Sequence, residues 1–425
     1  MPSIWIFNHD AMTPYNGTLT RHYSFTKYLL GMGYDVTIFA ASVVHNTQKN
    51  IIEDNSLFQE RMIDGVHFVY VRTSPYKGNG FSRIRNMTEF YVNLKRTIRS
   101  FAKPDLIYAS SPQILSLLAG VEAAKKLDIP CVCEVRDLWP ESIVEYNGTS
   151  RHNPIILILY ALERSIYRRS NAIIFTMEGM YDYIIQKKWD RLIDRKKCYY
   201  INNGVDIEDF DSCIGKYALD DPDLTDPDTF KVIYCGSIRT ANSINLLADC
   251  AAELQTRENA GNIRFLVYGE GPHKEQLIQR CSDENIRNIK FKGFVEKKYI
   301  PFILSRSNLN VLNYRVSSTQ KYGNSSNKLF EYLAAGHPVL ANIDEGNYPI
   351  ISKYGCGMVL KDRSAKSYAD AVLFFSQMDE ETYSVYCENA KDTAKLFDIP
   401  VLASKLDEVL RSGISEYTAL NRKES

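Results

Sequence analysis

The residues with the clearest chemical potential lie in the stretch 320–339, QKYGNSSNKLFEYLAAGHPV. Apolar residues recur there at the spacing of a buried helical stripe, which predicts a helix that begins at Ser326 or Asn327. Free backbone amides at a helix start favour an anion such as a diphosphate, and Lys328 adds a full positive charge. Glu331 falls one turn after Asn327, where its carboxylate could accept hydrogen bonds from paired sugar hydroxyls.

The same stretch also fits a surface helix without a ligand. In that interpretation Lys328 and Glu331 form an ordinary i, i+3 ion pair in solvent. One helix start is modest evidence for an anion site, so the local pattern leaves both interpretations open.

A second group of polar residues, RDLWPES at 136–142, follows the expected strand CVCEV. Asp137 would lie at the carboxyl end of a parallel strand, which is the edge where such sheets bind ligands. The same carboxylate could instead pair with Arg136 or cap the following turn, so a structural role is the alternative.

Strands and helices alternate through both halves of the chain. A strand at 4–7 leads through a polar loop containing Gly17 to a helix and a second strand, and the pattern restarts with FKVIYC, which ends before Gly236. This order predicts parallel sheets covered by helices, and 425 residues are too many for one ordinary core. No Gly-x-Gly pair continues into a dinucleotide fingerprint, and no Walker A lysine loop is present, so we discount NAD and FAD.

Composition excludes several classes of protein. Lys+Arg and Asp+Glu both total 51, so no overall charge favours a nucleic-acid partner. Nine scattered cysteines without a CxxC pair, no signal segment and no run of about 18 apolar residues predict a cytoplasmic protein with reduced thiols. The acidic stretch 220–228 contains two Asp-Pro-Asp triplets, but neither follows an apolar strand, so a bound metal is not predicted.

Two segments raise the question of a membrane surface. The stretch 81–103 is predicted to form an amphipathic helix with a basic face, which either is simply solvated or attracts anionic lipid headgroups at the inner face of the membrane. The apolar run at the start of 154–169 is too short to span a bilayer. We expect it to pack in the core, with a shallow membrane contact as the alternative.

SNKLFEYLAAGHPV resembles the signature of family 4 glycosyltransferases. The resemblance implies a GT-B fold, an α/β architecture of two Rossmann-like, doubly wound parallel-sheet domains that face a central cleft. RDLWPES resembles a sub-group of bacterial members that build surface polysaccharides such as O-antigen and capsule, including amino-sugar transferases. The family usually has two glutamates separated by seven residues; Glu331 matches the second, whereas Gly323 stands at the first.

The resemblance implies a retaining, metal-independent transfer of a sugar, possibly N-acetylated, from a UDP-linked donor to a hydroxyl of a lipid-linked glycan. The implied catalytic residues are Asp137, Lys328 and Glu331, and no cofactor is implied. Ser237 and Asn242 replace an arginine and a lysine of the family, which assigns the diphosphate charge to Arg239 and Lys328. The residues implied to bind the donor are Gly17, Gly236, Arg239, Gly269, Val295, Ser326, Asn327, Lys328 and Glu331.

The expected domains are an acceptor-binding domain at 1–206, a linker at 207–228, a donor-binding domain at 229–397 and a C-terminal helix at 398–425 that crosses back to the first domain. Two other functions remain open. One is a GT-B nucleotide-sugar epimerase, which needs no acceptor. The other is a non-catalytic scaffold of a polysaccharide assembly complex, which the missing first glutamate and the basic helix suggest.

Overall fold

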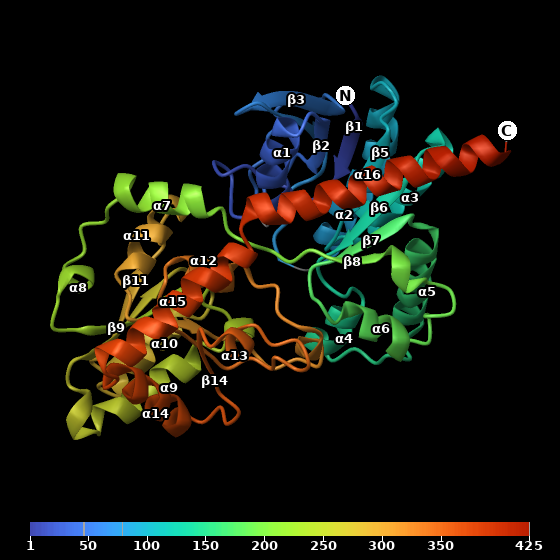
Figure 1. The fold of residues 1–425 in the computed structure, drawn as a ribbon. Coiled ribbons are helices and arrows are strands. Elements are labelled where there is room, and N and C mark those ends of the chain that lie inside the picture. Colours follow the sequence, from blue (N-terminus) through green and yellow to red (C-terminus); the bar gives the residue numbers. More distant parts are fainter. Residues whose placement is uncertain (46, 79, 425) are drawn as a thin grey trace. The chain divides into compact units, whose positions relative to one another are not determined.

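The computed structural model describes residues 1–45, 47–78 and 80–424. The chain divides into two compact units (Figure 1). Unit 1 comprises Met1–Asn202 together with Ile399–Ser425, and unit 2 comprises Asn203–Asp398. Each unit is an α/β domain built on one sheet, as the alternating pattern predicts.

The sheet of unit 1 has eight strands in the order β3-β4-β2-β1-β5-β6-β7-β8. All neighbours are parallel except β3, which pairs antiparallel with β4 at the edge. The strands are Ser3–Phe7 (β1), Asp35–Ala41 (β2), Phe58–Ile63 (β3), Val66–Val71 (β4), Leu106–Ser110 (β5), Cys131–Val135 (β6), Ala172–Phe175 (β7) and Cys198–Tyr200 (β8).

Helices cover this sheet, and the C-terminal helix α16 is one of them although it follows unit 2 in the sequence (Figure 1). Leu402, Leu406 and Leu410 of α16 are buried in the same core as Phe25 and Leu29 of α1. The helices are Arg21–Gly31 (α1), Phe81–Thr97 (α2), Ile114–Leu127 (α3), Glu141–Asn147 (α4), Pro154–Arg169 (α5), Met180–Gln186 (α6) and Ile399–Glu424 (α16).

The sheet of unit 2 has six parallel strands in the order β11-β10-β9-β12-β13-β14. The strands are Phe230–Cys235 (β9), Ile263–Tyr268 (β10), Ile289–Gly293 (β11), Leu309–Leu312 (β12), Val339–Ala341 (β13) and Gly357–Val359 (β14). The helices are Ile207–Lys216 (α7), Pro222–Thr225 (α8), Asn245–Gln255 (α9), Lys274–Asp283 (α10), Ile300–Ser305 (α11), Asn327–Ala334 (α12), Ile351–Tyr354 (α13), Ala365–Ser376 (α14) and Glu380–Leu396 (α15).

The stretch 207–228, expected as a linker, instead contains α7 and α8 and belongs to unit 2. Aspartates begin both helices, because Asp206 and Asp221 each accept a hydrogen bond from a backbone amide of the first turn. The first Asp-Pro-Asp triplet, at 221–223, forms ion pairs. Lys292 pairs with Asp221 and Asp223 at 2.7 and 2.5 Å, which explains why this acidic loop packs against the domain.

The apolar run of α5 does not pack in the core as expected. Ile155, Leu157 and Ile158 are 66%, 51% and 67% exposed, whereas Ile156 is buried. The helix buries a different stripe, which continues through Tyr160 and three further residues, Glu163, Ile166 and Tyr167. Among the described residues, no helix combines the length and the apolarity that crossing a membrane requires.

Candidate functional site

The predicted anion site in unit 2 is built around the first turn of α12. This helix begins at Asn327, as predicted, and Ser326 precedes it in an extended conformation. The Ser326 side chain does not cap the helix; its hydroxyl forms a 2.7 Å hydrogen bond with the hydroxyl of Tyr314. Ser326 therefore does not compete with a ligand for the backbone amides of the first turn, which carry the positive end of the helix dipole.

Lys328 is held over this helix start by aromatic side chains. Its Nζ lies 3.1 Å from the Tyr234 hydroxyl and 4.8 and 4.9 Å from the ring centres of Tyr234 and Tyr314. The Tyr234 hydroxyl donates in turn to the backbone carbonyl of Ser237 at 2.9 Å. Both aromatic partners are uncharged, so the positive charge of Lys328 is oriented without being neutralised.

Two glycines let the neighbouring strand ends approach Lys328 and each other. A Cβ on Gly236 would lie 2.7 Å from Lys328 Cε, and a Cβ on Gly269 would lie 1.8 Å from the Gly236 carbonyl oxygen. Any side chain at either position would displace Lys328 or the backbone. The structure thus brings together Gly236, Gly269 and Lys328, three of the residues implied to bind the donor.

Glu331 lies one turn along α12, and its side chain is 23% exposed. Its Oε1 is 3.8 Å from Nζ of Lys297, which is a long contact for an ion pair. Within the described ranges Lys328 and Glu331 do not pair with each other, so the surface ion pair considered for this helix is not formed. The Glu331 carboxylate remains accessible to a polar ligand.

The residues that replace the basic pair of the family bond to one another. The Asn242 amide donates to the carbonyl and the hydroxyl of Ser237 at 2.6 and 2.9 Å, which braces the loop after β9. Arg239 of the same loop is exposed. Val295 follows β11 and packs partly buried against the core beneath α12. Arg239 and Val295 therefore lie beyond the carboxyl ends of strands, but no described contact joins either side chain to Lys328.

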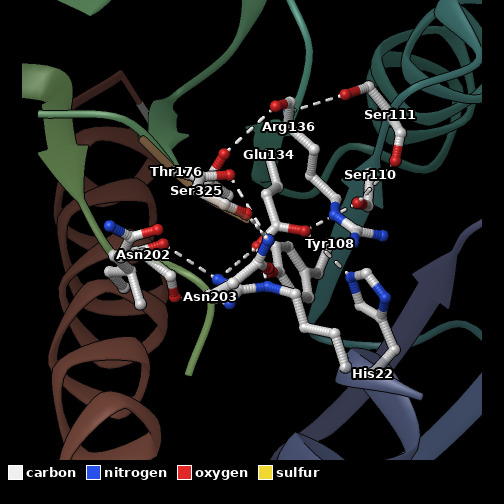
Figure 2. Close-up of polar contacts among 12 residues, drawn as sticks. His22, Tyr108, Ser110, Ser111, Glu134, Arg136, Thr176, Asn202, Asn203 and Ser325 are labelled. Atoms are coloured by element: carbon white, nitrogen blue, oxygen red, sulfur yellow. Dashed lines mark hydrogen bonds and ion pairs between the residues drawn. The ribbon is translucent and has the colours of Figure 1, made fainter. Parts of the chain in front are cut away.

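The loop before α12 is held without the first glutamate of the family. Gly323, which stands at that position, has φ 111°, a conformation that favours glycine. Asn324 Oδ1 accepts a hydrogen bond from the Ser326 amide at 2.7 Å, and Asn203 Nδ2 donates to the Ser325 carbonyl at 2.5 Å (Figure 2). The sequence analysis missed Asn203.

Unit 1 contains a buried polar network centred on Glu134 of β6 (Figure 2). The carboxylate accepts hydrogen bonds from Tyr108 and Ser110, both at 2.6 Å, and pairs with Arg21 and His22 at 2.8 and 3.0 Å. Burial by itself would raise the pKa of Glu134, but Arg21 and His22 outweigh it and hold the pKa well below its usual range. Glu134 is therefore a buried carboxylate anion.

Arg21 also binds the backbone at the end of the first segment of unit 1. Arg21 Nη1 and Nη2 donate to the backbone carbonyls of Asn202 and Ile201 at 2.5 and 2.9 Å. Asn202 is the last residue of the first segment of unit 1, and Asn203, the first residue of unit 2, bonds to Ser325. The chain is thus anchored on both sides of the unit boundary. In the sequence, the one signal for this network is a glutamate inside the otherwise apolar strand CVCEV.

Asp137 lies just beyond β6, as predicted, and is exposed. In the part of the chain that the structure describes, it neither pairs with Arg136 nor caps α4, which excludes both structural roles considered for it. The surrounding protein raises the pKa of Asp137, Arg136 opposes the rise, and the Asp10 carboxylate adds to it. Asp137 is thus an exposed carboxyl group whose charged form is disfavoured by its surroundings and by the negative charge of Asp10.

Asp10, which the sequence analysis missed, is buried in the loop after β1. It pairs with His9 and His45 at 2.8 and 3.1 Å, and these histidines overcome burial to hold the pKa of Asp10 well below its usual range. The signal was the polar NHD directly after a strand. Gly17 follows in the same loop, where its amide donates to the Thr13 carbonyl at 3.2 Å and its open side packs against Met12.

Both units match families of known proteins. Residues 15–209 match the model of Glycosyltransferase Family 4, and residues 219–393 match the model of Glycosyl transferases group 1. The chain is a glycosyltransferase of the GT-B fold. The fold and the enzyme class expected from SNKLFEYLAAGHPV are thereby confirmed.

Solved glycosyltransferases share the fold across the whole chain. Sucrose-phosphate synthase from Thermosynechococcus elongatus aligns with a TM-score of 0.74 at 15% identity, covering 98% of this chain and 100% of that one. HepE of Anabaena in complex with UDP-glucose aligns with 0.66 at 15% identity over 96% and 99%. WaaG, a glycosyltransferase involved in lipopolysaccharide biosynthesis, aligns with 0.63 at 13% identity over 96% and 99%.

A curated relative adds a more limited match. The 2-deoxystreptamine N-acetyl-D-glucosaminyltransferase of Niallia circulans is 26% identical over 132 residues, which are 31% of this chain and 32% of that enzyme. The match thus spans about a third of the relative's length.

Proposed function

We propose that this glycosyltransferase moves a sugar, with retention of anomeric configuration, from a UDP-linked donor to a hydroxyl of a lipid-linked glycan in bacterial surface-polysaccharide synthesis. The observation that carries the proposal is the position of Lys328 at the start of α12, where Tyr234 orients it and Gly236 leaves room for it. This arrangement is suited to a diphosphate.

Each donor group has a proposed partner in unit 2. The amides that begin α12, from Asn327 onward, receive the diphosphate together with Lys328, and Arg239 supplies a second positive charge. Glu331 accepts hydrogen bonds from the ribose hydroxyls, and the backbone at Val295 contacts the base.

Charge develops on the leaving diphosphate as the sugar bond breaks. Lys328 and the helix dipole are preorganised where that negative charge grows, and such stabilisation is usually the largest single catalytic contribution. In unit 1 we place Asp137 at the reacting face of the sugar, with Gly17 lining the loop that approaches it. The acceptor hydroxyl then attacks from the face that the diphosphate leaves, which retains the configuration, and no metal or cofactor takes part in the proposal.

Relatives favour the finer details of this proposal. HepE has been solved with UDP and with UDP-glucose, which favours a UDP-linked donor. The Niallia circulans relative is by name an N-acetyl-D-glucosaminyltransferase, which favours an N-acetylated amino sugar. WaaG is involved in lipopolysaccharide biosynthesis, which favours a surface glycan as the product.

We further propose a peripheral contact of α2 with the inner face of the cell membrane, where a lipid-linked acceptor would lie. Phe81 and Ile84 at the start of this helix are 82% and 56% exposed. Arg96 and Arg99 add positive charge to the stretch 81–103, whose buried stripe includes Met87, Phe90 and Leu94. Exposed apolar residues and basic residues on one amphipathic segment suit an anionic bilayer surface.

Incubation of the purified chain with UDP-sugars and a lipid-linked acceptor tests the activity. We expect a glycosylated lipid and free UDP, with the anomeric configuration of the donor retained in the product. An isomerised free nucleotide sugar would identify an epimerase instead. Failure to bind any nucleotide, in a folded protein, would favour the scaffold.

A further inference from the structure

Unit 2 contains a cavity of about 740 Å³ that the donor site does not account for. It is lined by residues of α9 and α10 and by the loops after β9, β12, β13 and β14. Its volume falls within the range of small-molecule sites, roughly 300–1,000 Å³. The charged residues of its lining are Arg239, Asp249, Arg280, Arg315 and Arg363.

The residues that line this cavity carry more positive than negative charge. Arg280 is neutralised, because it pairs with Asp249 at 2.6 Å and with Glu284 at 2.8 Å. Arg363 donates to the uncharged carbonyl of Asn342 at 2.7 Å and keeps its charge. Arg239 and Arg315 have no ion pair among the described residues.

Three guanidinium groups, those of Arg239, Arg315 and Arg363, therefore line one cavity and pair with no carboxylate of the described residues. A cleft lined by one sign of charge concentrates counter-ions, and the planar guanidinium fork matches phosphate oxygens in a bidentate geometry. Thr240 and His273, which bond to each other at 2.8 Å, add polar groups at the same wall.

We propose that this cavity binds a small phosphate ester, such as a sugar phosphate or a nucleotide, as a second ligand of the enzyme. Arg315 and Arg363 are the principal contacts. The lining shares Arg239 with the proposed donor contacts but contains none of Gly236, Gly269, Lys328 or Glu331, so the part of the cavity at Arg315 and Arg363 is distinct from the helix start that receives the donor diphosphate.

One side chain lies between the two sites. The Tyr314 ring lines the cavity, and its centre lies 4.9 Å from Nζ of Lys328, while its hydroxyl bonds to Ser326. A ligand in the cavity would therefore contact the aromatic wall that orients Lys328. The site itself is independent of the proposed function, whereas this link to the donor rests on it.

Calorimetric titration of the full chain tests the second site. With UDP already saturating, glucose 6-phosphate, UMP and inorganic phosphate are titrated separately. We expect saturable binding of at least one ester. R315Q and R363Q should each weaken it by about tenfold or more, because each removes a charged hydrogen-bond donor. The preferred ester identifies the natural source, a sugar phosphate or a nucleotide.

Control variants separate this site from the donor site. R287Q, which removes an exposed arginine outside the cavity, should leave ester binding unchanged. K328A should retain ester binding while it loses UDP. Absence of binding by all three probes would overturn the proposal. Loss of UDP binding in R315Q or R363Q would also overturn it, since the cavity would then be part of the donor site.

Discussion

The ammonium group of Lys328 lies 3.1 Å from the hydroxyl of Tyr234 and over its ring. Burial raises the pKa of Tyr234 although Lys328 opposes the rise, so the phenol stays neutral at physiological pH. The lysine therefore keeps its charge for a ligand. Its orientation depends on aromatic packing and on Gly236 rather than on a carboxylate partner.

Replacement of Lys328 by alanine should slow turnover by about a hundredfold or more, because one preorganised donor to the developing negative charge is lost. Steady-state release of UDP measures the effect, and an unchanged melting curve without ligand confirms that the variant folds. K361A removes an exposed lysine of the same unit and should behave like the wild type. Near-normal turnover of K328A would show that Lys328 is not part of the active site.

Asn203→Ala should reduce kcat/KM by about tenfold, since the amide that holds the Ser325 carbonyl at 2.5 Å is removed. We expect Asn203 to position the donor loop rather than to touch the reacting atoms, so the KM for the donor should rise more than kcat falls. Asn203→Gln, which restores a donor on a longer side chain, should recover part of the loss. An unchanged KM would contradict this role.

Unit 1 should lose stability as the pH falls. The folded-state pKa of Glu134 is depressed by Arg21 and His22, and burial lowers the folded-state pKa of His22. Both groups contribute stability that is present above their unfolded pKa values, about 4.3 and about 6.5, and that is lost as the pH falls through the folded values.

All three tryptophans, Trp5, Trp139 and Trp189, lie in unit 1, so their fluorescence during urea unfolding measures its stability. In the background of Glu163→Gln, where Glu163 does not titrate, we expect the free energy of unfolding to fall below about pH 6.5 through His22 and further below about pH 4.3 through Glu134. Glu134→Gln should lose about 3–5 kcal/mol at pH 7, because it leaves Arg21 buried without its anion. A Gln variant as stable as the wild type at pH 7 would contradict the network.

Glu163 on α5 should have the opposite pH dependence. It is fully buried, and burial raises its pKa to about 8, although hydrogen bonds from Tyr167 and Tyr183 oppose the rise. A raised folded-state pKa means that stability is lost as the pH rises from the unfolded value of about 4.3 toward 8.

In the variant Glu163→Gln the side chain does not ionise, so the variant does not lose this stability as the pH rises. Relative to the wild type, the variant should therefore gain stability between pH 5 and pH 8, measured by the same tryptophan fluorescence. A difference between the two proteins that does not change with pH would contradict a raised pKa for Glu163.

Local pattern predicts much of this fold. The alternation of strands and helices indicates two parallel sheets, and the stripe in NKLFEYLA predicts a helix that begins at Asn327. These features depend on residues that are neighbours in the sequence. Polar loops that follow apolar strands likewise place Asp137 and Gly236 at sheet edges.

Such local patterns do not predict contacts between residues that are far apart in the sequence. Arg21 and Glu134 are 113 positions apart, and Asn203 and Ser325 are 122 apart, so only the folded topology brings them together. Local pattern also failed to predict that Ile155 and Ile158 are exposed, for a similar reason. Which face of α5 is buried depends on the layer it packs against, and the buried face includes Glu163 rather than the most apolar run.

Thermal unfolding of the wild type and of K328A against a panel of nucleoside diphosphates and nucleotide sugars tests the central claim most directly. A ligand at 100 times its dissociation constant adds about 2.7 kcal/mol to the folded state. We predict a clear increase in Tm with UDP, a larger one with one UDP-sugar, and loss of both in K328A. No shift with any ligand, in a wild-type protein shown to be folded, would contradict a donor site at the start of α12.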